Sequence, residues 1–127
     1  MVWLLDDPSA SAKKIKSATT DSEGSVRFDL ATKPGISNLL TIYSVLTGRT
    51  IPSIEAEYAG HGYGDFKSGL AEVVTETFGP IRARVLELLD DRAELDRILA
   101  GNADRAAAIA DATLARVYDR VGFLPRA

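Results

Sequence analysis

The chain offers few side chains that could carry out covalent or metal-dependent chemistry. It has 127 residues, one histidine and no cysteine. A Ser–His–Asp arrangement would depend on His61 alone, which lies in a glycine-rich stretch with no visible triad spacing. The sequence contains neither a Walker-type phosphate-binding loop nor a dinucleotide-binding glycine motif. We therefore expect His61 to be an exposed loop residue, and we expect this chain to contribute no catalytic residue and no metal ligand.

Three lysines form the most concentrated group of positive charge in the sequence. Lys13, Lys14 and Lys16 lie on successive turns and neighbouring faces of one short predicted helix, near its C-terminal end. Cations are favoured there by the helix dipole. So many lysines repel one another unless something negative lies close by. Backbone phosphate of a nucleic acid is one candidate for that role, and a solvated surface is the other.

A polar loop follows the lysines. Asp21, Ser22 and Glu23 can accept hydrogen bonds from the exocyclic amines of unstacked bases. The same residue types are equally suited to turns and helix caps. The two interpretations differ in what a substitution would do, because a cap stabilises the fold whereas a base contact stabilises only the complex.

Hydrophobic spacing indicates the elements that must position these residues. Ile36, Leu39, Leu40 and Tyr43 recur at intervals of three and four residues, which is typical of an amphipathic helix. Similar patterns predict an all-α helical bundle with mostly antiparallel neighbours and a loop over residues 19–33. We expect Gly79-Pro80 to kink the longest helix. The predicted helices cover residues 7–18, 34–47, 53–58, 65–89, 91–100 (ended by Gly101) and 103–121.

Composition limits the function classes. The hydrophobic fraction is 46% and the net charge is −3, so RNA binding must use a local basic patch rather than the whole surface. The longest apolar run is far too short to span a membrane, and the start of the chain does not resemble a secretory signal. We expect one helical domain over residues 1–127, located in the cytoplasm and without a membrane partner.

Several motifs in order resemble the C-terminal part of bacterial tryptophanyl-tRNA synthetases. They are KIKSATTDSEG (14–24), VRFD (26–29), KPGISNLLTIYSVLTG (33–48), YAGHGYGDFK (58–67), GPIRAR (79–84) and VYDRVGF (117–123). The resemblance covers nearly the whole chain. It implies the C-terminal helical domain of a class I synthetase whose Rossmann catalytic domain lies upstream. Residues 1–18 would form the link to that domain.

The resemblance also implies what the parent enzyme does. It would attach tryptophan to its tRNA using ATP with magnesium, as a homodimer, and this part would recognise the tRNA anticodon. The chain has no HIGH-like motif, and KKIKS (13–17) falls after the position of the KMSKS-like loop. We therefore expect this chain alone to be inactive and to bind no cofactor. Its partners would be tRNA and the catalytic domain of the same parent chain.

The predicted tRNA-contacting surface combines the cations with the polar loop. Cations would fix the backbone phosphates while polar groups meet bases. The alternative is a free-standing, non-catalytic helical module that binds RNA or protein, and the discriminating observation is what precedes Met1 in the full gene product. The residues of the predicted surface are Lys13, Lys14, Lys16, Asp21, Ser22, Glu23, Arg27 and Lys67.

Overall fold

The computed structural model describes residues 1–124 and confirms the all-α prediction. Within these residues there is no strand. The helices are α1 (Pro8–Lys16), α2 (Pro34–Thr47), α3 (Ile51–Glu57), α4 (Tyr63–Asp90) and α5 (Arg92–Val121). The chain separates into two compact units, Met1–Arg84 and a second that begins at Val85, so the boundary falls inside α4. Whether the chain acts as a single domain stays a prediction.

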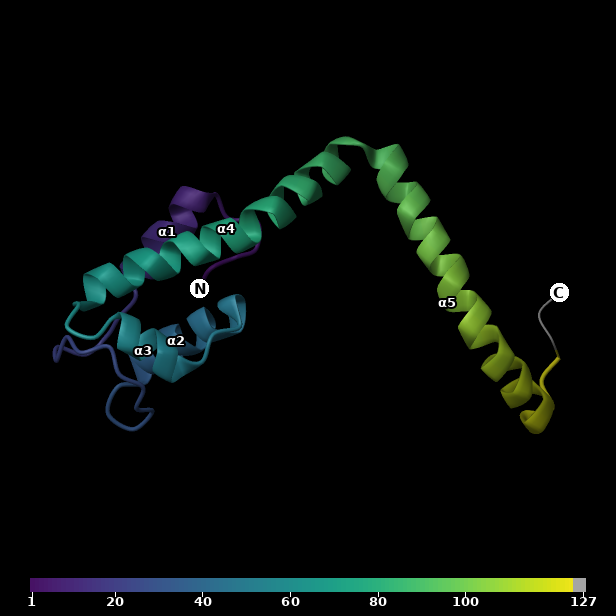
Figure 1. Cartoon of the computed structure of the whole chain (residues 1–127). Coiled ribbons are helices and arrows are strands. Elements are labelled where there is room, and N and C mark those ends of the chain that lie inside the picture. The colour runs from purple at the N-terminus through teal and green to yellow at the C-terminus, as the bar shows by residue number, and fades with distance from the viewer. Residues whose placement is uncertain (125–127) are drawn as a thin grey trace. The chain divides into compact units, whose positions relative to one another are not determined.

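The core of the first unit lies where α2, α3 and the first half of α4 meet (Figure 1). Phe66, Leu70 and Val74 are almost completely buried and recur every four residues along one face of α4. Tyr43 of α2 stacks on Phe66 with ring centroids 5.9 Å apart. This core fixes the start of α4, and the loop of residues 17–33 packs against it.

Local signals explain where the helices begin. Pro8 occupies the first turn of α1, and the Asp7 carboxylate caps that helix by accepting a hydrogen bond from the Ser9 N–H. Helix α3 begins at Ile51, two residues earlier than expected. The reason is that Pro52 falls in its first turn, where no intrahelical N–H donor is needed.

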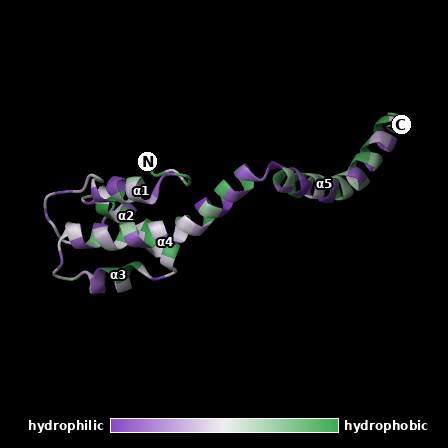
Figure 2. Cartoon of the chain, turned by 90° about the horizontal axis from the view of Figure 1, so that it is seen from above, coloured by the Kyte–Doolittle hydropathy of each residue, from purple (hydrophilic) through white to green (hydrophobic). Residues whose placement is uncertain are grey.

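The second unit corrects one prediction. Gly101 does not end a helix, and α5 runs through it from Arg92 to Val121 as one continuous element. A single glycine costs a helix only about 1 kcal/mol relative to alanine, and the alanine-rich sequence that follows favours helix strongly. None of the residues of α5 is buried, and polar and apolar residues both occur along its length (Figure 2).

The helical hydrogen-bonding pattern of α4 also continues through Gly79-Pro80. The proline removes one N–H donor there without dividing the helix into two elements. The bend expected at this point stays a prediction.

Candidate nucleic-acid interface

The first unit is organised around a buried lysine that sequence inspection did not single out. Lys33 ends the loop before α2, and only 1% of its surface is exposed. Its Nζ donates to Tyr63 Oη at 3.0 Å, to the Ser25 carbonyl at 3.2 Å and to Asp21 Oδ1 at 3.2 Å. It also lies 2.9 Å from Glu23 Oε2. Burial by itself lowers the pKa of Lys33, but the interactions with Tyr63, Glu23 and Asp21 outweigh it and raise the pKa above its ordinary value.

Asp21 takes part in the same network. Tyr63 Oη, at the start of α4, lies 2.7 Å from both of its carboxylate oxygens, and the Glu23 N–H donates to Oδ1 at 2.9 Å. The hydrogen bond from Tyr63, followed by those from Glu23 N–H and Lys33, lowers the pKa of Asp21 from 3.8 to about 2. The carboxylate therefore holds the loop onto α4. We call Asp21, Glu23, Lys33 and Tyr63 the Lys33 cluster.

The predicted lysines divide into two groups. Lys13 and Lys16 are exposed on α1, and no partner for either ammonium group is present among residues 1–124. Lys14 instead forms an ion pair with Asp6 at 2.6 Å. Lys67 donates to the Ala18 carbonyl at 2.8 Å and to Thr20 Oγ1 at 2.9 Å, so it fastens the start of the loop to α4.

The remaining predicted residues lie in the loop itself. Ser22 is exposed. Arg27 is about half exposed and pairs with Asp29 at 3.2 Å. Asp29 in turn accepts hydrogen bonds from Thr32 Oγ1 and from the N–H groups of Ala31 and Thr32, which orders the chain before α2. The structure thus brings Asp21 and Glu23 together, while Arg27 lies further along the loop.

Signals for the missed residues are weak in the sequence. Lys33 directly precedes Pro34 at the end of the predicted loop, and lysine is a residue type that is usually exposed on the surface. Its partners stand 12 and 30 residues away, so only the tertiary structure brings them into contact. Glu55 of α3 was also missed, and its Oε1 accepts a hydrogen bond from the Phe28 N–H at 2.6 Å.

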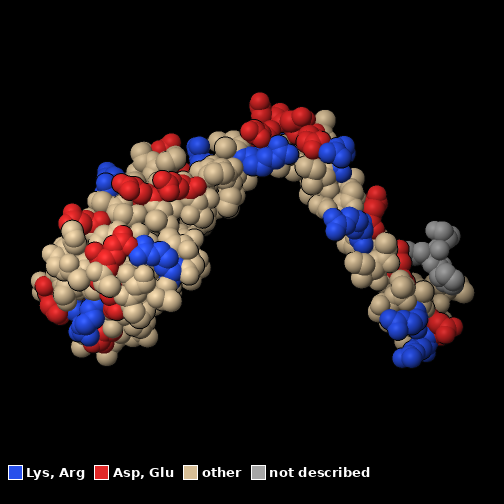
Figure 3. All heavy atoms as spheres, viewed as in Figure 1, with Lys and Arg blue, Asp and Glu red and all other residues tan. Residues whose placement is uncertain are grey.

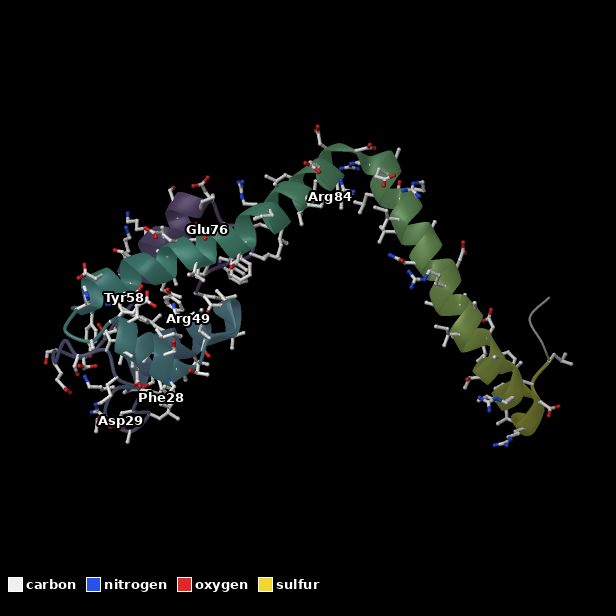
Figure 4. All side chains as sticks on the ribbon, in the orientation of Figure 1. Phe28, Asp29, Arg49, Tyr58, Glu76 and Arg84 are labelled. Atoms are coloured by element: carbon white, nitrogen blue, oxygen red, sulfur yellow. The ribbon has the colours of Figure 1, made fainter. Side chains whose placement is uncertain are left out.

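A groove of about 550 Å³ runs between the loop and the turn that connects α3 to α4. One wall is residues 23–27 and the other is residues 58–62, with Glu55 beside them. Tyr58 and His61 meet edge to face on the turn side, with ring centroids 6.3 Å apart. Figure 4 labels Tyr58 on the turn side, and Phe28 and Asp29 where the loop wall ends. We call this the loop–turn groove.

His61 is an exposed residue of that turn, as the sequence predicts. Its Nδ1 lies 3.4 Å from Asp65 Oδ2, in the first turn of α4. No group of histidine and carboxylate side chains within residues 1–124 is arranged to hold a metal ion. On the face drawn in Figure 3, acidic and basic side chains of the first unit are interspersed, so no broad basic patch covers that face.

Comparison with known proteins identifies the family. The protein-family model described as tRNA synthetases class I (W and Y) matches residues 1–79, which is more than half of the chain. The chain belongs to this synthetase family. A tryptophan–tRNA ligase from Leifsonia xyli is 61% identical over 98% of the chain, and one from Bacillus subtilis is 52% identical over 95%. These matches cover 37% and 36% of the two relatives, so the chain spans little more than a third of their length.

A solved structure of a tryptophanyl-tRNA synthetase has the same fold as this chain. Tryptophanyl-tRNA synthetase from Mycoplasma pneumoniae superposes with a TM-score of 0.82 at 30% identity. The superposition covers 97% of this chain and 38% of that one. Within residues 1–124 no helix is both long and apolar enough to cross a membrane.

Proposed function

We propose that this chain is the tRNA-recognising helical part of a tryptophan–tRNA ligase. The observation that carries the proposal is the 61% identity to a tryptophan–tRNA ligase over 98% of the chain. In the parent enzyme, ATP with magnesium would activate tryptophan in the catalytic domain of the same polypeptide. The parent would act in the cytoplasm as a homodimer, and the surface described above would meet the anticodon region of the tRNA.

The contacts within the first unit suggest different roles for the proposed surface residues. Lys13 and Lys16 are suited to backbone phosphate, because their charges are exposed and not neutralised. Lys14 and Lys67 contribute through the segments that they hold in place. Ser22 and Arg27 are open to bases, whereas Asp21 and Glu23 act mainly by shaping the loop.

Salt-dependent binding tests the phosphate contacts. Lys13→Ala and Lys16→Ala in the full-length protein should weaken binding to tRNA. Each should also reduce the slope of log affinity against log salt by about 1, because one fewer counterion is released. Val45→Ala is the control, since Val45 is exposed on α2 and uncharged. An unchanged slope in both lysine variants would remove α1 from the interface.

A second pair of variants separates base contact from loop support. Asp21→Ala should lower the melting temperature, because it removes the acceptor for Tyr63 and Lys33. Ser22→Ala, at the exposed neighbouring position, should leave the melting temperature within about 2 °C of the wild type. If Asp21→Ala instead reduces affinity for the cognate anticodon without any loss of stability, Asp21 contacts a base directly.

A further inference from the structure

The C-terminal half of α5 carries its positive and negative charges on separate sides of the helix. At 100° per residue, its three arginines fall within about 60° of one another around the helix axis, and its three aspartates are centred about 110° away. Figure 3 shows basic side chains along one side of this part of α5 and acidic side chains along the other. The charged residues are Arg105, Arg116 and Arg120 on one side and Asp104, Asp111 and Asp119 on the other. We call the three arginines the arginine face.

We propose that the arginine face binds the sugar–phosphate backbone of the tRNA without reading its bases. The inference rests on the proposed function and adds a second RNA-contacting surface to it. This surface belongs to the second unit, whereas the residues proposed to meet the anticodon all belong to the first.

The charge of the arginine face is not neutralised within residues 1–124, where none of its members forms an ion pair. Arg116 donates to neutral acceptors, which are Thr113 Oγ1 at 3.1 Å and the Ala112 carbonyl at 3.3 Å. Arg97, nearer the start of the same helix, differs because both of its hydrogen bonds, at 2.8 Å, go to the carboxylate of Glu94. The arginine face is therefore open to a negatively charged partner.

Arg116 and Arg120 line a hollow of about 200 Å³ together with Thr113 and Val117. Residues four apart lie one above the other on a helix, with Cβ atoms about 5–6 Å apart, so both guanidinium groups can reach the same or adjacent phosphates. The planar guanidinium group matches the oxygens of a phosphate in a bidentate geometry. Like charges at this spacing repel each other in the free chain, and an anion bound between them relieves that repulsion.

The length of the arginine face favours a polymer of negative charge over a small anion. Arg105 and Arg120 are 15 positions apart, which is about 22 Å along a helix. The exposed apolar residues Leu114, Val117 and Val121 are centred about 130° from the arginines. A protein surface packed on that apolar side would leave the arginines facing solvent. The arginine face therefore remains available to a nucleic-acid backbone.

Removing two of these charges is the direct test. In the full-length protein, Arg116→Gln/Arg120→Gln should raise the dissociation constant for the complete tryptophan tRNA at least about tenfold at about 0.1 M salt. The slope of log affinity against log salt should fall by about 2, which is one for each arginine. Arg116→Lys/Arg120→Lys keeps both charges and should keep the slope. The loss should be equal for a tRNA with an altered anticodon, because backbone contacts carry no sequence information.

Arg92→Gln/Arg97→Gln is the matched control. It changes the net charge of α5 by the same amount, but neither residue belongs to the arginine face. Its dissociation constant should stay within about twofold of the wild type. An unchanged salt slope in Arg116→Gln/Arg120→Gln overturns the proposal. So does a lower melting temperature with unchanged tRNA affinity, because the arginines would then pair with carboxylates of the same polypeptide. If the wild type shows no preference for the cognate anticodon, the proposed anticodon recognition fails, which is a separate result.

Chemical modification of the wild type gives a second measurement that needs no variant. The full-length protein is treated with phenylglyoxal with and without tRNA, and the modified arginines are identified by mass spectrometry. Arg116 and Arg120 should react in the free protein and much more slowly in the complex, whereas Arg97 should react at the same rate in both. If Arg116 and Arg120 are unreactive in the free protein, or are not protected by tRNA, the proposal is overturned.

Discussion

Lys33 shows how one side chain can order a loop that has no regular secondary structure. Its ammonium group is buried among two carboxylates, a phenol and a backbone carbonyl. Lys33→Met keeps most of the volume but leaves Asp21 and Glu23 facing each other without a cation. We expect the melting temperature to fall by at least about 5 °C, because more than one internal hydrogen bond is lost. Lys13→Met, at an exposed position of similar chemistry, should change it by less than about 2 °C.

The carboxylate of Asp21 makes the stability of the first unit depend on pH. Its pKa is lowered from 3.8 to about 2 in the folded chain, so the deprotonated form is favoured by folding. The resulting stability is fully present above about pH 4 and is lost as the pH falls towards 2. Asp21→Asn should therefore be less stable than the wild type at pH 7, and the difference should shrink on acidification. Urea denaturation at several pH values measures this, and a constant difference down to pH 2 would contradict it.

Residue types alone predicted part of the candidate site. The lysines of α1 and the polar loop were identified because clustered charge and hydrogen-bond acceptors are visible in a sequence. The sequence did not show the direction in which each of these side chains points. Asp21 faces Tyr63, which is 42 residues away, and such a pairing leaves no local pattern. Lys33 was missed for the same reason, since only the folded chain reveals that it is buried.

At the scale of elements, one glycine marks a close approach between a helix and the loop. A Cβ built on Gly35, in the first turn of α2, would lie 2.5 Å from the Thr19 carbonyl oxygen. Gly35→Ala should therefore destabilise the first unit, by roughly 1–3 kcal/mol for an overpacked contact against backbone. Chemical denaturation of the full-length protein measures this change in the free energy of unfolding.

Gly101→Ala is the matched control for that substitution. Gly101 lies inside α5, and a Cβ there meets nothing within 4 Å. Alanine should raise helix stability by up to about 1 kcal/mol, because it loses less backbone entropy on folding. Opposite signs for the two glycines are the expected result. If Gly35→Ala left the free energy of unfolding unchanged, the loop near Thr19 would have to move away from the added methyl group at little cost.

Periodicity predicted the helices well and their ends less well. The stripes on α2 and α4 were clear because their apolar residues pack into one core. Gly101 was misjudged because a glycine typically ends a helix by adopting the left-handed backbone conformation itself, and the sequence does not show whether it does so. Gly122 does so, with φ of 74°, and Gly101 remains helical.

At the scale of the whole molecule, this chain should not activate tryptophan by itself. Adenylation needs donors positioned around the phosphates of ATP, and the sequence contains no phosphate-binding motif. Tryptophan-dependent pyrophosphate exchange with a homogeneous preparation of the 127-residue chain should give the background rate. The full-length protein, assayed at the same molar concentration, is the positive control. Exchange above background by the short chain would contradict the expectation.

The hydrogen bonds from the loop backbone to side chains also affect how the chain exchanges protons with solvent. The Phe28 amide donates to Glu55, and the Asp29 amide donates to Ser37 Oγ at 2.8 Å. Neither belongs to a helix, yet both protons can leave only when the loop separates from α3 or α2. After transfer to heavy water, the NMR signals of these two amide protons should therefore persist far longer than the signal of the amide proton of exposed Ser22. Such retention would mark the loop as part of the same cooperative unit as the helices that hold it.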